Sequence, residues 1–183
     1  MTAIPLTRVP FEPLPAAPRP LRVALAGCGV VGGGVLPRLL GRPDVVLVSV
    51  LVRSPGKIRS PEPPSGLVVT DPAALLAREP DVVIDTLSDA SVSLALIRAA
   101  LSRGVHVVSA SKQAVAADVD GLSALAAATG VTLRYSAAVG GGVPMLEAVQ
   151  LAREMGPIRR IEAVLNGTVN FLLNRLATGY PFE

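Results

Sequence analysis

Residues 21–34 read Leu-Arg-Val-Ala-Leu-Ala-Gly-Cys-Gly-Val-Val-Gly-Gly-Gly, and this stretch decides the fold. The apolar run Leu21–Ala26 predicts a strand that passes into a glycine-rich turn and then into a helix over about residues 30–40. In such a turn the first glycine permits the tight bend, the second leaves room for a pyrophosphate, and the third lets helix and strand pack closely. Free N–H groups at the helix start favour an anion there. The predicted cofactor contacts at this turn are Gly27, Gly29, Val30, Val31 and Gly32.

A glycine-rich turn with only a structural role is the alternative to a dinucleotide site. The context favours the dinucleotide site, because a strand precedes the turn, a helix follows it, and strands and helices continue to alternate beyond it.

The composition of the 183-residue chain excludes several classes of protein. A net charge of +3, with aromatic residues at 3%, argues against a nucleic-acid-binding surface. No apolar run reaches the roughly 18 residues that cross a bilayer, and we find no signal-peptide pattern, so we expect no membrane partner. The single cysteine, Cys28, excludes an internal disulfide and fits a reducing cytoplasm. We expect it to be a small apolar filler, since no partner base is apparent.

The order of the predicted elements sets the fold class. Residues 1–20 contain six prolines and predict an extended arm. From Leu21 onward we predict strands at 21–26, 45–52, 67–69, 82–87, 105–109 and 131–135, and helices at 30–40, 72–77, 89–103 and 120–129. This alternation predicts an α/β fold, a Rossmann-like doubly wound and mostly parallel sheet over residues 21–135.

The pattern changes after Tyr135. Residues 136–143 are small and glycine-rich, and we predict a helix over 144–155, a strand over 158–165 and a helix over about 169–177. One strand and two helices cannot cover both faces of a sheet. Residues 136–183 therefore predict an incomplete second α+β domain.

Ligands of open α/β sheets bind beyond the carboxyl ends of the strands. The loop after the second strand carries Arg53, Ser54, Lys57 and, further on, Arg59. An NAD site usually places an acid here, whereas cations and a hydroxyl would hold the 2′-phosphate of NADP. A solvated basic loop is the alternative, but together with the glycine turn these residues favour NADP.

Two more strand ends carry candidate residues. Ser88 follows the fourth strand and is expected near the nicotinamide; Asp85 and Asp89 could form an acid pair, but we assign neither a catalytic role and expect Asp89 to cap a helix. Lys112 follows the fifth strand in Ser109-Ala110-Ser111-Lys112. It could hold a carbonyl oxygen or a carboxylate, or move a proton, unless it is merely a solvated lysine. We expect no catalytic role for His106.

Three segments resemble the homoserine dehydrogenase family: Val108–Lys112, Tyr135–Pro144 and Leu165–Asn170, which recur there in this order. Residues 21–178 look like the N-terminal half of that family. The resemblance implies NAD(P)H-dependent reduction of L-aspartate 4-semialdehyde to L-homoserine, on the route to threonine and methionine.

The resemblance also implies roles for particular residues. Lys112 would contact substrate and cofactor and support proton or charge movement at the carbonyl, while Gly167 and Thr168 would line the substrate pocket. The expected cofactor contacts beyond the glycine turn are Arg53, Lys57, Ser88, Ser109 and Lys112. The main-chain oxygens expected to ligate a sodium-like ion are those of Ser136, Val139, Gly141 and Val143.

The chain departs from the family pattern at three places. Ser136 stands where the family has glutamate, and Ser111 replaces the usual asparagine. The acidic stretch and the Asp…Lys pair that follow in the family are not within these 183 residues, so we expect little turnover from this chain alone and a homodimer for a full-length enzyme. The alternative is a stand-alone NADP-binding or regulatory module. Sugar-type Rossmann reductases fit less well, because they typically have Glu-Lys-Pro where this chain has Ser111-Lys112-Gln113.

Overall fold

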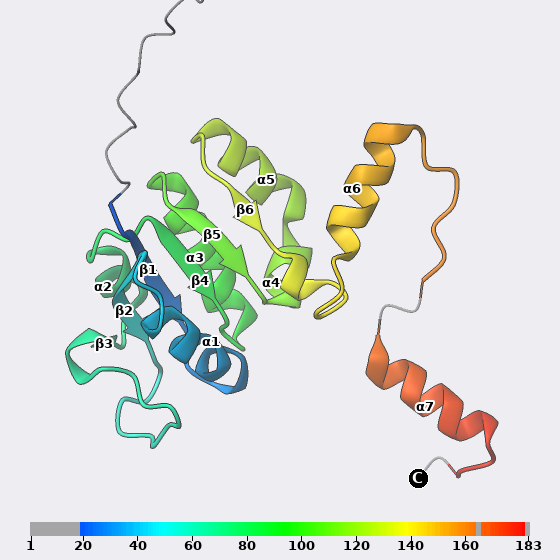
Figure 1. Cartoon of the computed structure of the whole chain (residues 1–183), viewed down its shortest axis with the longest axis horizontal. Coiled ribbons are helices and arrows are strands. Elements are labelled where there is room, and N and C mark those ends of the chain that lie inside the picture. The colour runs from blue at the N-terminus through cyan, green and yellow to red at the C-terminus, as the bar shows by residue number, and fades with distance from the viewer. Residues whose placement is uncertain (1–18, 164–165, 182–183) are drawn as a thin grey trace, which may run out of the picture.

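The computed structural model describes residues 19–163 and 166–181 (Figure 1). Almost all of the predicted proline-rich arm, residues 1–18, lies outside the described residues. Six parallel strands form one sheet in the order β3-β2-β1-β4-β5-β6. The strands are β1 (Leu21–Ala26), β2 (Val45–Leu51), β3 (Val68–Val69), β4 (Val82–Asp85), β5 (His106–Ser109) and β6 (Leu133–Arg134). This order confirms the predicted Rossmann-like α/β fold.

Helices connect the strands and continue beyond the sheet. They are α1 (Val30–Leu40), α2 (Pro72–Leu76), α3 (Ala90–Ser102), α4 (Lys112–Ala117), α5 (Val119–Ala128), α6 (Met145–Met155) and α7 (Gly167–Ala177), with short 3₁₀ turns η1 (Ser65–Leu67) and η2 (Ser136–Ala138). None of the helices in the described ranges is long and apolar enough to cross a membrane.

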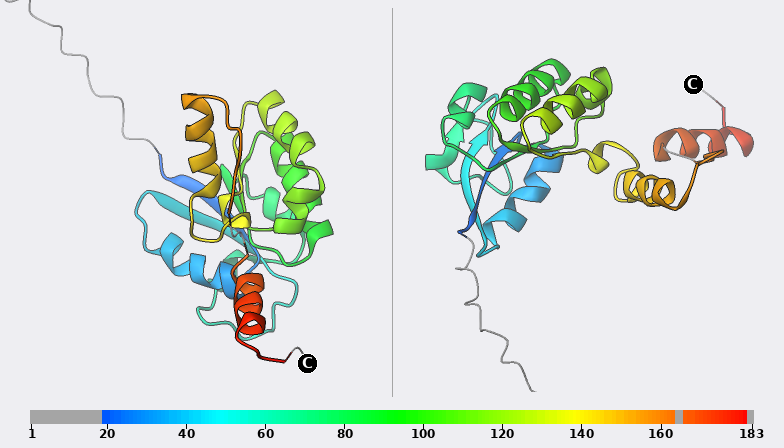
Figure 2. Two further views of the ribbon diagram at one scale, coloured as in Figure 1. Left: turned by 90° about the vertical axis from the view of Figure 1, so that its right-hand side faces the viewer. Right: turned by 90° about the horizontal axis from the view of Figure 1, so that it is seen from above.

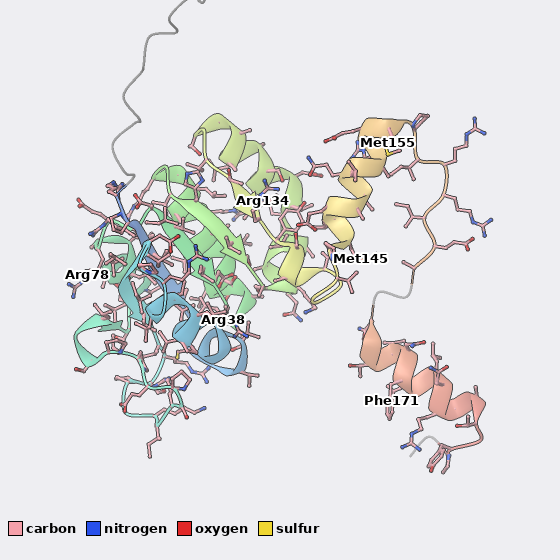
Figure 3. The ribbon with its side chains drawn as sticks, viewed as in Figure 1. Arg38, Arg78, Arg134, Met145, Met155 and Phe171 are labelled. Carbon is pink, nitrogen blue, oxygen red and sulfur yellow. The ribbon has the colours of Figure 1, made fainter. Side chains whose placement is uncertain are left out.

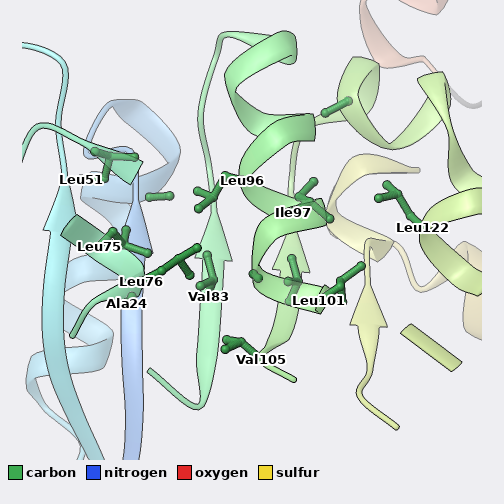
Figure 4. Close-up of a cluster of buried hydrophobic side chains, with 14 of the residues drawn as sticks. Ala24, Leu51, Leu75, Leu76, Val83, Leu96, Ile97, Leu101, Val105 and Leu122 are labelled. Atoms are coloured by element: carbon green, nitrogen blue, oxygen red, sulfur yellow. The ribbon is translucent and has the colours of Figure 1, made fainter. Parts of the chain in front are cut away.

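The alternation of side chains along β1 divides the core into two halves. Ala24 and Ala26 face a large cluster that contains residues from α2, α3, α4 and α5 (Figure 4). Val23 and Leu25 point to the opposite face and pack with Leu36 and Leu39 of α1. The buried apolar side chains on both faces of the central strand explain why its sequence is an almost unbroken apolar run.

The strand ends lie in register at one edge of the sheet. Ala26 pairs with Leu51 on one side and with Asp85 on the other, and Asp85 pairs in turn with Ser109. The chain runs outward from β1 to β3 and then returns to β4, so the order of the strands reverses between β1 and β4. The residues that follow these four strands are therefore gathered at the switch point, where ligands of this architecture bind.

The sequence-based predictions hold for most elements, with two differences. Residues 112–117 form a helix, α4, ahead of the predicted helix at 120–129, which is α5 in the structure. The strand predicted over 158–165 is wrong in its described part, because residues 157–163 have no regular structure. A strand needs a neighbouring strand to satisfy its backbone groups, and no described strand pairs with this segment.

The segment after β6 leaves the sheet. Figures 1 and 2 show α6 beside the end of β6 and α7 standing apart from the sheet. Met155 on α6 and Phe171 on α7 are exposed apolar residues (Figure 3). In the part of the chain that the structure describes, these helices carry no buried residue.

Candidate functional site

The glycine turn has the geometry that its spacing predicts. Gly27 has a φ of +93°, a backbone conformation that favours glycine, and its N–H donates to the Leu51 carbonyl at 2.9 Å. A Cβ on Gly32 would lie 2.1 Å from the Gly27 carbonyl oxygen, whereas one on Gly29 would meet nothing within 4 Å. Gly32 therefore allows helix α1 to pack onto the turn, and Gly29 leaves open space beside the backbone. This open cradle fits a pyrophosphate.

The start of α1 presents donors and exposed apolar side chains to that space. No side chain caps the helix at Gly29, and its first turn contains no acidic residue. Val30 and Val31 are exposed, at 97% and 55%. The uncapped N–H groups and the helix dipole favour an anion, and the valines offer apolar surface to the rest of a nucleotide.

Thr86 holds the turn, and the sequence analysis did not identify it. Its Oγ1 lies 3.0 Å from the carbonyl oxygens of both Ala26 and Gly27, and its N–H donates to the Ala26 carbonyl at 2.8 Å. A Cβ on Gly27 would stand only 2.8 Å from Thr86 Oγ1. The end of β4 thus braces the end of β1. The only sequence signal was a hydroxyl residue near the carboxyl end of the predicted strand 82–87.

The loop after β2 is compact and basic. Arg59 donates to the carbonyl oxygens of Lys57 and Ser54, each at 2.7 Å, and Lys57 N–H donates to the Ser54 carbonyl at 3.2 Å. The side chains of Arg53 and Lys57 are exposed. Arg59 thus folds the loop into a turn that leaves two cationic side chains at its surface.

Cys28 lies within the glycine turn, and its side chain points into the protein. The residue is buried in the apolar cluster below α1, as its predicted role as a filler requires. Burial raises the pKa of its thiol, and the positive charge of Arg59 opposes that rise. The basic loop follows β2, whose last residue, Leu51, pairs with Ala26 and accepts the Gly27 N–H at 2.9 Å, so the loop and the glycine turn begin side by side.

Asp85, the last residue of β4, and Asp89, four residues later, have structural roles. Asp89 caps α3: its Oδ1 accepts from the Ser91 hydroxyl and from the N–H groups of Ser91 and Val92 at 2.7–3.1 Å. The Ser91 hydroxyl is the largest cause that lowers the pKa of Asp89, and Arg53 contributes a smaller effect. Asp85 is fully buried. Ser88, between them, is exposed and open to a ligand.

Lys112 is the first residue of α4 and projects from the same edge of the sheet. It is exposed, and none of the hydrogen bonds or ion pairs found among the described residues involves its side chain. Ser109, three residues earlier, is fully buried, and its hydroxyl donates to Asp85 Oδ2 at 2.7 Å. The Ser109 side chain is therefore committed inside the protein, which leaves only its main chain for a cofactor.

His106, on β5, accepts the Thr132 N–H at 3.0 Å through Nδ1, as a strand residue with a local hydrogen bond.

The residues expected to bind a sodium-like ion lie in the turn between β6 and α6. The Ser136 carbonyl accepts from Val139 N–H at 2.9 Å, and the Val143 carbonyl accepts from Met145 N–H at 2.8 Å. Gly141 has a φ of +65°. The Ser136 hydroxyl donates to Glu147 of α6, and this bond is the largest cause that lowers the pKa of Glu147. The sequence analysis missed Glu147, because a contact across eleven residues and a loop leaves no periodic signal.

The structure does not bring every predicted residue together. Gly27–Gly32, Arg53, Lys57, Ser88 and Lys112 all follow strands that end at one edge of the sheet. Gly167 and Thr168 begin α7, which Figures 1 and 2 show apart from that edge. Asn166 caps this helix by accepting the Val169 N–H at 3.1 Å. Their role in substrate binding stays a prediction.

Comparisons with known proteins give consistent results. A family model described as "Homoserine dehydrogenase, NAD binding domain" matches residues 27–136. The homoserine dehydrogenase of Neisseria gonorrhoeae is 30% identical over 169 residues, which cover 86% of this chain and 38% of that protein. The homoserine dehydrogenase of Mycobacterium bovis is 30% identical over 181 residues, which cover 92% of this chain and 40% of that protein. The chain thus spans about two fifths of the length of these curated relatives.

Solved structures agree with the family model. The crystal structure of a homoserine dehydrogenase from Thiobacillus denitrificans matches with a TM-score of 0.68 and 29% identity, over 88% of this chain and 39% of that one. A homoserine dehydrogenase from Thermoplasma acidophilum matches with a TM-score of 0.72 over 89% of this chain and 57% of that one; at 22% identity it supports the fold alone.

Proposed function

This chain belongs to the homoserine dehydrogenase family, and we propose that it binds NADPH for the reduction of L-aspartate 4-semialdehyde to L-homoserine. A nicotinamide-cofactor domain and an oxidoreductase class follow from the family. The choice of NADP and the activity itself are proposals. We propose residues 21–135 as the cofactor domain and residues 136–183 as part of the substrate domain.

The single observation that supports this proposal best is the pairing of the open glycine cradle with the basic loop after β2. The cradle at Gly29 leaves space for a pyrophosphate beside uncapped N–H groups. The exposed cations Arg53 and Lys57 lie on a turn that Arg59 holds, where an NAD-specific site would carry a carboxylate. Two cations can pair with the two negative charges of a 2′-phosphate.

Lys112 is the residue we propose for the chemical step. A bound nicotinamide cofactor would supply the hydride. As hydride adds to the aldehyde carbon, negative charge develops on the carbonyl oxygen, and the Lys112 ammonium would stabilise that charge or deliver a proton to the oxygen. Its exposure at the ligand end of β5, free of partners among the described residues, leaves the ammonium available for this contact.

The remaining finer predictions also stay proposals. Ser88 would lie near the nicotinamide, and Gly167 and Thr168 would line the substrate pocket. A monovalent cation would take the carbonyl oxygens of Ser136, Val139, Gly141 and Val143. A carbonyl oxygen that accepts one hydrogen bond keeps a second lone pair, and the carboxylate of Glu147 beside Ser136 adds negative charge. We also propose a homodimer for an enzyme of full length.

Fluorescence titration of the chain with NADPH and with NADH tests the proposal. We expect saturable binding of NADPH and at least tenfold weaker binding of NADH, because NADH lacks the 2′-phosphate. An assay with L-aspartate 4-semialdehyde then reports whether this chain turns over by itself. Absence of binding to either nucleotide would overturn the proposed function.

A further inference from the structure

The carboxyl group of Asp85 is buried, and the proposed reaction has no direct use for it. It lies at the end of β4 and is fully shielded from solvent. Its Oδ2 accepts from the hydroxyls of Ser93, on α3, at 2.6 Å and of Ser109, on β5, at 2.7 Å. Its Oδ1 accepts the Leu87 N–H at 3.1 Å. A buried carboxylate is costly unless donors of this kind surround it, so the network holds three segments of chain to one point.

The two serines differ in what else they hold. The Ser109 hydroxyl oxygen also accepts the N–H of Ser111 at 3.1 Å, while it donates to Asp85. The Ser93 hydroxyl makes no second hydrogen bond among the described residues. Only Ser109 therefore passes the constraint on from the buried carboxylate to the chain that leads into α4.

Ser111 is the residue on which α4 starts. It is the N-cap of the helix, but its own side chain makes no capping bond. Its N–H is held by Ser109, and its carbonyl accepts the Val115 N–H at 3.2 Å. Ser111 is itself buried, as are Ala114 and Val115 on the inner side of α4. The next residue after this fixed point is Lys112, whose side chain is exposed.

We propose that Asp85 and Ser109 are positioning residues for Lys112, because the chain of hydrogen bonds from Asp85 through Ser109 to Ser111 fixes the main chain from which the lysine projects. The role of the Lys112 ammonium in the reaction rests on the proposed function. The positioning of Lys112 by Asp85 and Ser109 does not. A main chain held in place lets the side chain reach its target with little further loss of freedom.

The experiment uses the chain's scarcity of lysine. Lys57 and Lys112 are the only two lysines, so a full chain labelled with ¹⁵N-lysine gives two backbone amide signals, and Lys57→Arg assigns them. Ser109→Ala should move the Lys112 signal by more than its line width. Ser93→Ala is the matched control, because it removes the other hydroxyl from the same Asp85 oxygen, and the Ser93 hydroxyl makes no hydrogen bond to α4 among the described residues. It should leave both signals in place.

Two more variants keep the outcome decisive. Ser109→Thr retains the hydroxyl and should leave the Lys112 signal at its original position. Should Ser109→Ala fail to fold, Ser109→Cys fills the site with a weakly hydrogen-bonding thiol and should move the signal. The positioning role is overturned if removal of the Ser109 hydroxyl leaves the Lys112 signal unmoved, or if Ser93→Ala or Ser109→Thr moves it as far.

Titration with NADPH of the same samples separates this inference from the proposed function. We expect Ser109→Ala to raise the Kd for NADPH at least threefold and Ser93→Ala to leave it within twofold. If the unmodified chain binds no NADPH, the proposed function fails, while the Lys112 signals still decide whether Asp85 and Ser109 position the lysine.

Discussion

Gly32 and Gly27 lie so close together that a Cβ on Gly32 would stand 2.1 Å from the carbonyl oxygen of Gly27. The same Cβ would also lie 2.7 Å from Thr86 Oγ1. Helix α1 can therefore begin on the turn only because position 32 has no side chain. The close approach places the uncapped N–H groups of α1 beside the open space at Gly29.

Gly32→Ala should disrupt the site. The added methyl group must push α1 away from the turn, so we expect a loss of about 1–3 kcal/mol in the free energy of unfolding and at least tenfold weaker NADPH binding. Urea unfolding and fluorescence titration measure the two effects. Gly34→Ala, in the same helix, is the control: its Cβ meets nothing within 4 Å. It should raise stability by up to about 1 kcal/mol and leave binding within twofold. Equal effects of both substitutions would contradict the close-packing argument.

Thr86→Val should weaken the turn without altering its shape. The substitution removes the hydroxyl that lies 3.0 Å from the Ala26 and Gly27 carbonyl oxygens. We expect a loss of about 1–2 kcal/mol in the free energy of unfolding. The Kd values for NADPH and NADH should rise by the same factor, because the turn serves the pyrophosphate that both share. Thr86→Ser, which keeps the hydroxyl, should restore binding. A change in the preference between the two nucleotides would argue against this role.

Lys57→Glu should weaken NADPH binding at least tenfold and NADH binding less than threefold. The new carboxylate repels the 2′-phosphate, which NADPH carries and NADH lacks. Titration with both nucleotides at one salt concentration measures this. Arg78→Glu makes the same change of charge at an exposed residue on the far, amino edge of the sheet (Figure 3). It should alter both affinities less than twofold. If Lys57→Glu weakens both nucleotides equally, the basic loop does not select NADP.

Lys112→Ala should leave the fold intact, because the side chain is exposed and makes no hydrogen bond among the described residues. Its unfolding midpoint in urea should match that of the unmodified chain. In any preparation of this protein that reduces L-aspartate 4-semialdehyde, we expect Lys112→Ala to lower kcat at least a hundredfold. Unchanged turnover would remove Lys112 from the chemical step.

The carboxyl group of Asp81 should make the free energy of unfolding depend on pH. The Arg19 guanidinium, with its hydrogen bonds at 2.6 and 2.8 Å, is the main cause that lowers the pKa of Asp81, and the Arg22 N–H contributes. A carboxyl with a lowered pKa in the folded state stabilises the fold above its ordinary value of 3.8, and this contribution disappears as the pH falls through the folded-state pKa.

Asp81→Asn should therefore destabilise the chain at pH 7, and the loss should shrink at an acidic pH well below 3.8, where the Asp81 carboxyl becomes protonated in the folded state. Arg19 is largely exposed, so we expect a modest loss of about 1 kcal/mol at pH 7. Urea unfolding at both pH values measures it. Glu62→Gln, at an exposed loop position, should show no such difference between the two conditions. A loss that is equal at both pH values would contradict the role of the Asp81 charge.

Much of the fold follows from local sequence. The alternation of Ala24 and Ala26 with Val23 and Leu25, the glycine spacing, and the cap at Asp89 depend on neighbours within a few residues, so a single sequence specifies them. The helix at 112–117 was not predicted from the sequence. The predicted strand at 158–165 is absent in its described part, because its formation requires a partner strand that the local pattern does not supply.

The sequence by itself determined the order of the six sheet strands and of most helices, the strand ends that carry the proposed cofactor residues, and the family resemblance at Val108–Lys112, Tyr135–Pro144 and Leu165–Asn170. Only the tertiary structure decided which distant groups meet: Thr86 against Gly27, Asp85 with Ser93 and Ser109, and Ser136 with Glu147. The physical reason is how far apart in the sequence the interacting residues lie. Hydrophobic periodicity and turn chemistry depend on residues within a few positions of one another. A hydrogen bond between distant segments, in contrast, depends on the register of a sheet that the chain must first assemble.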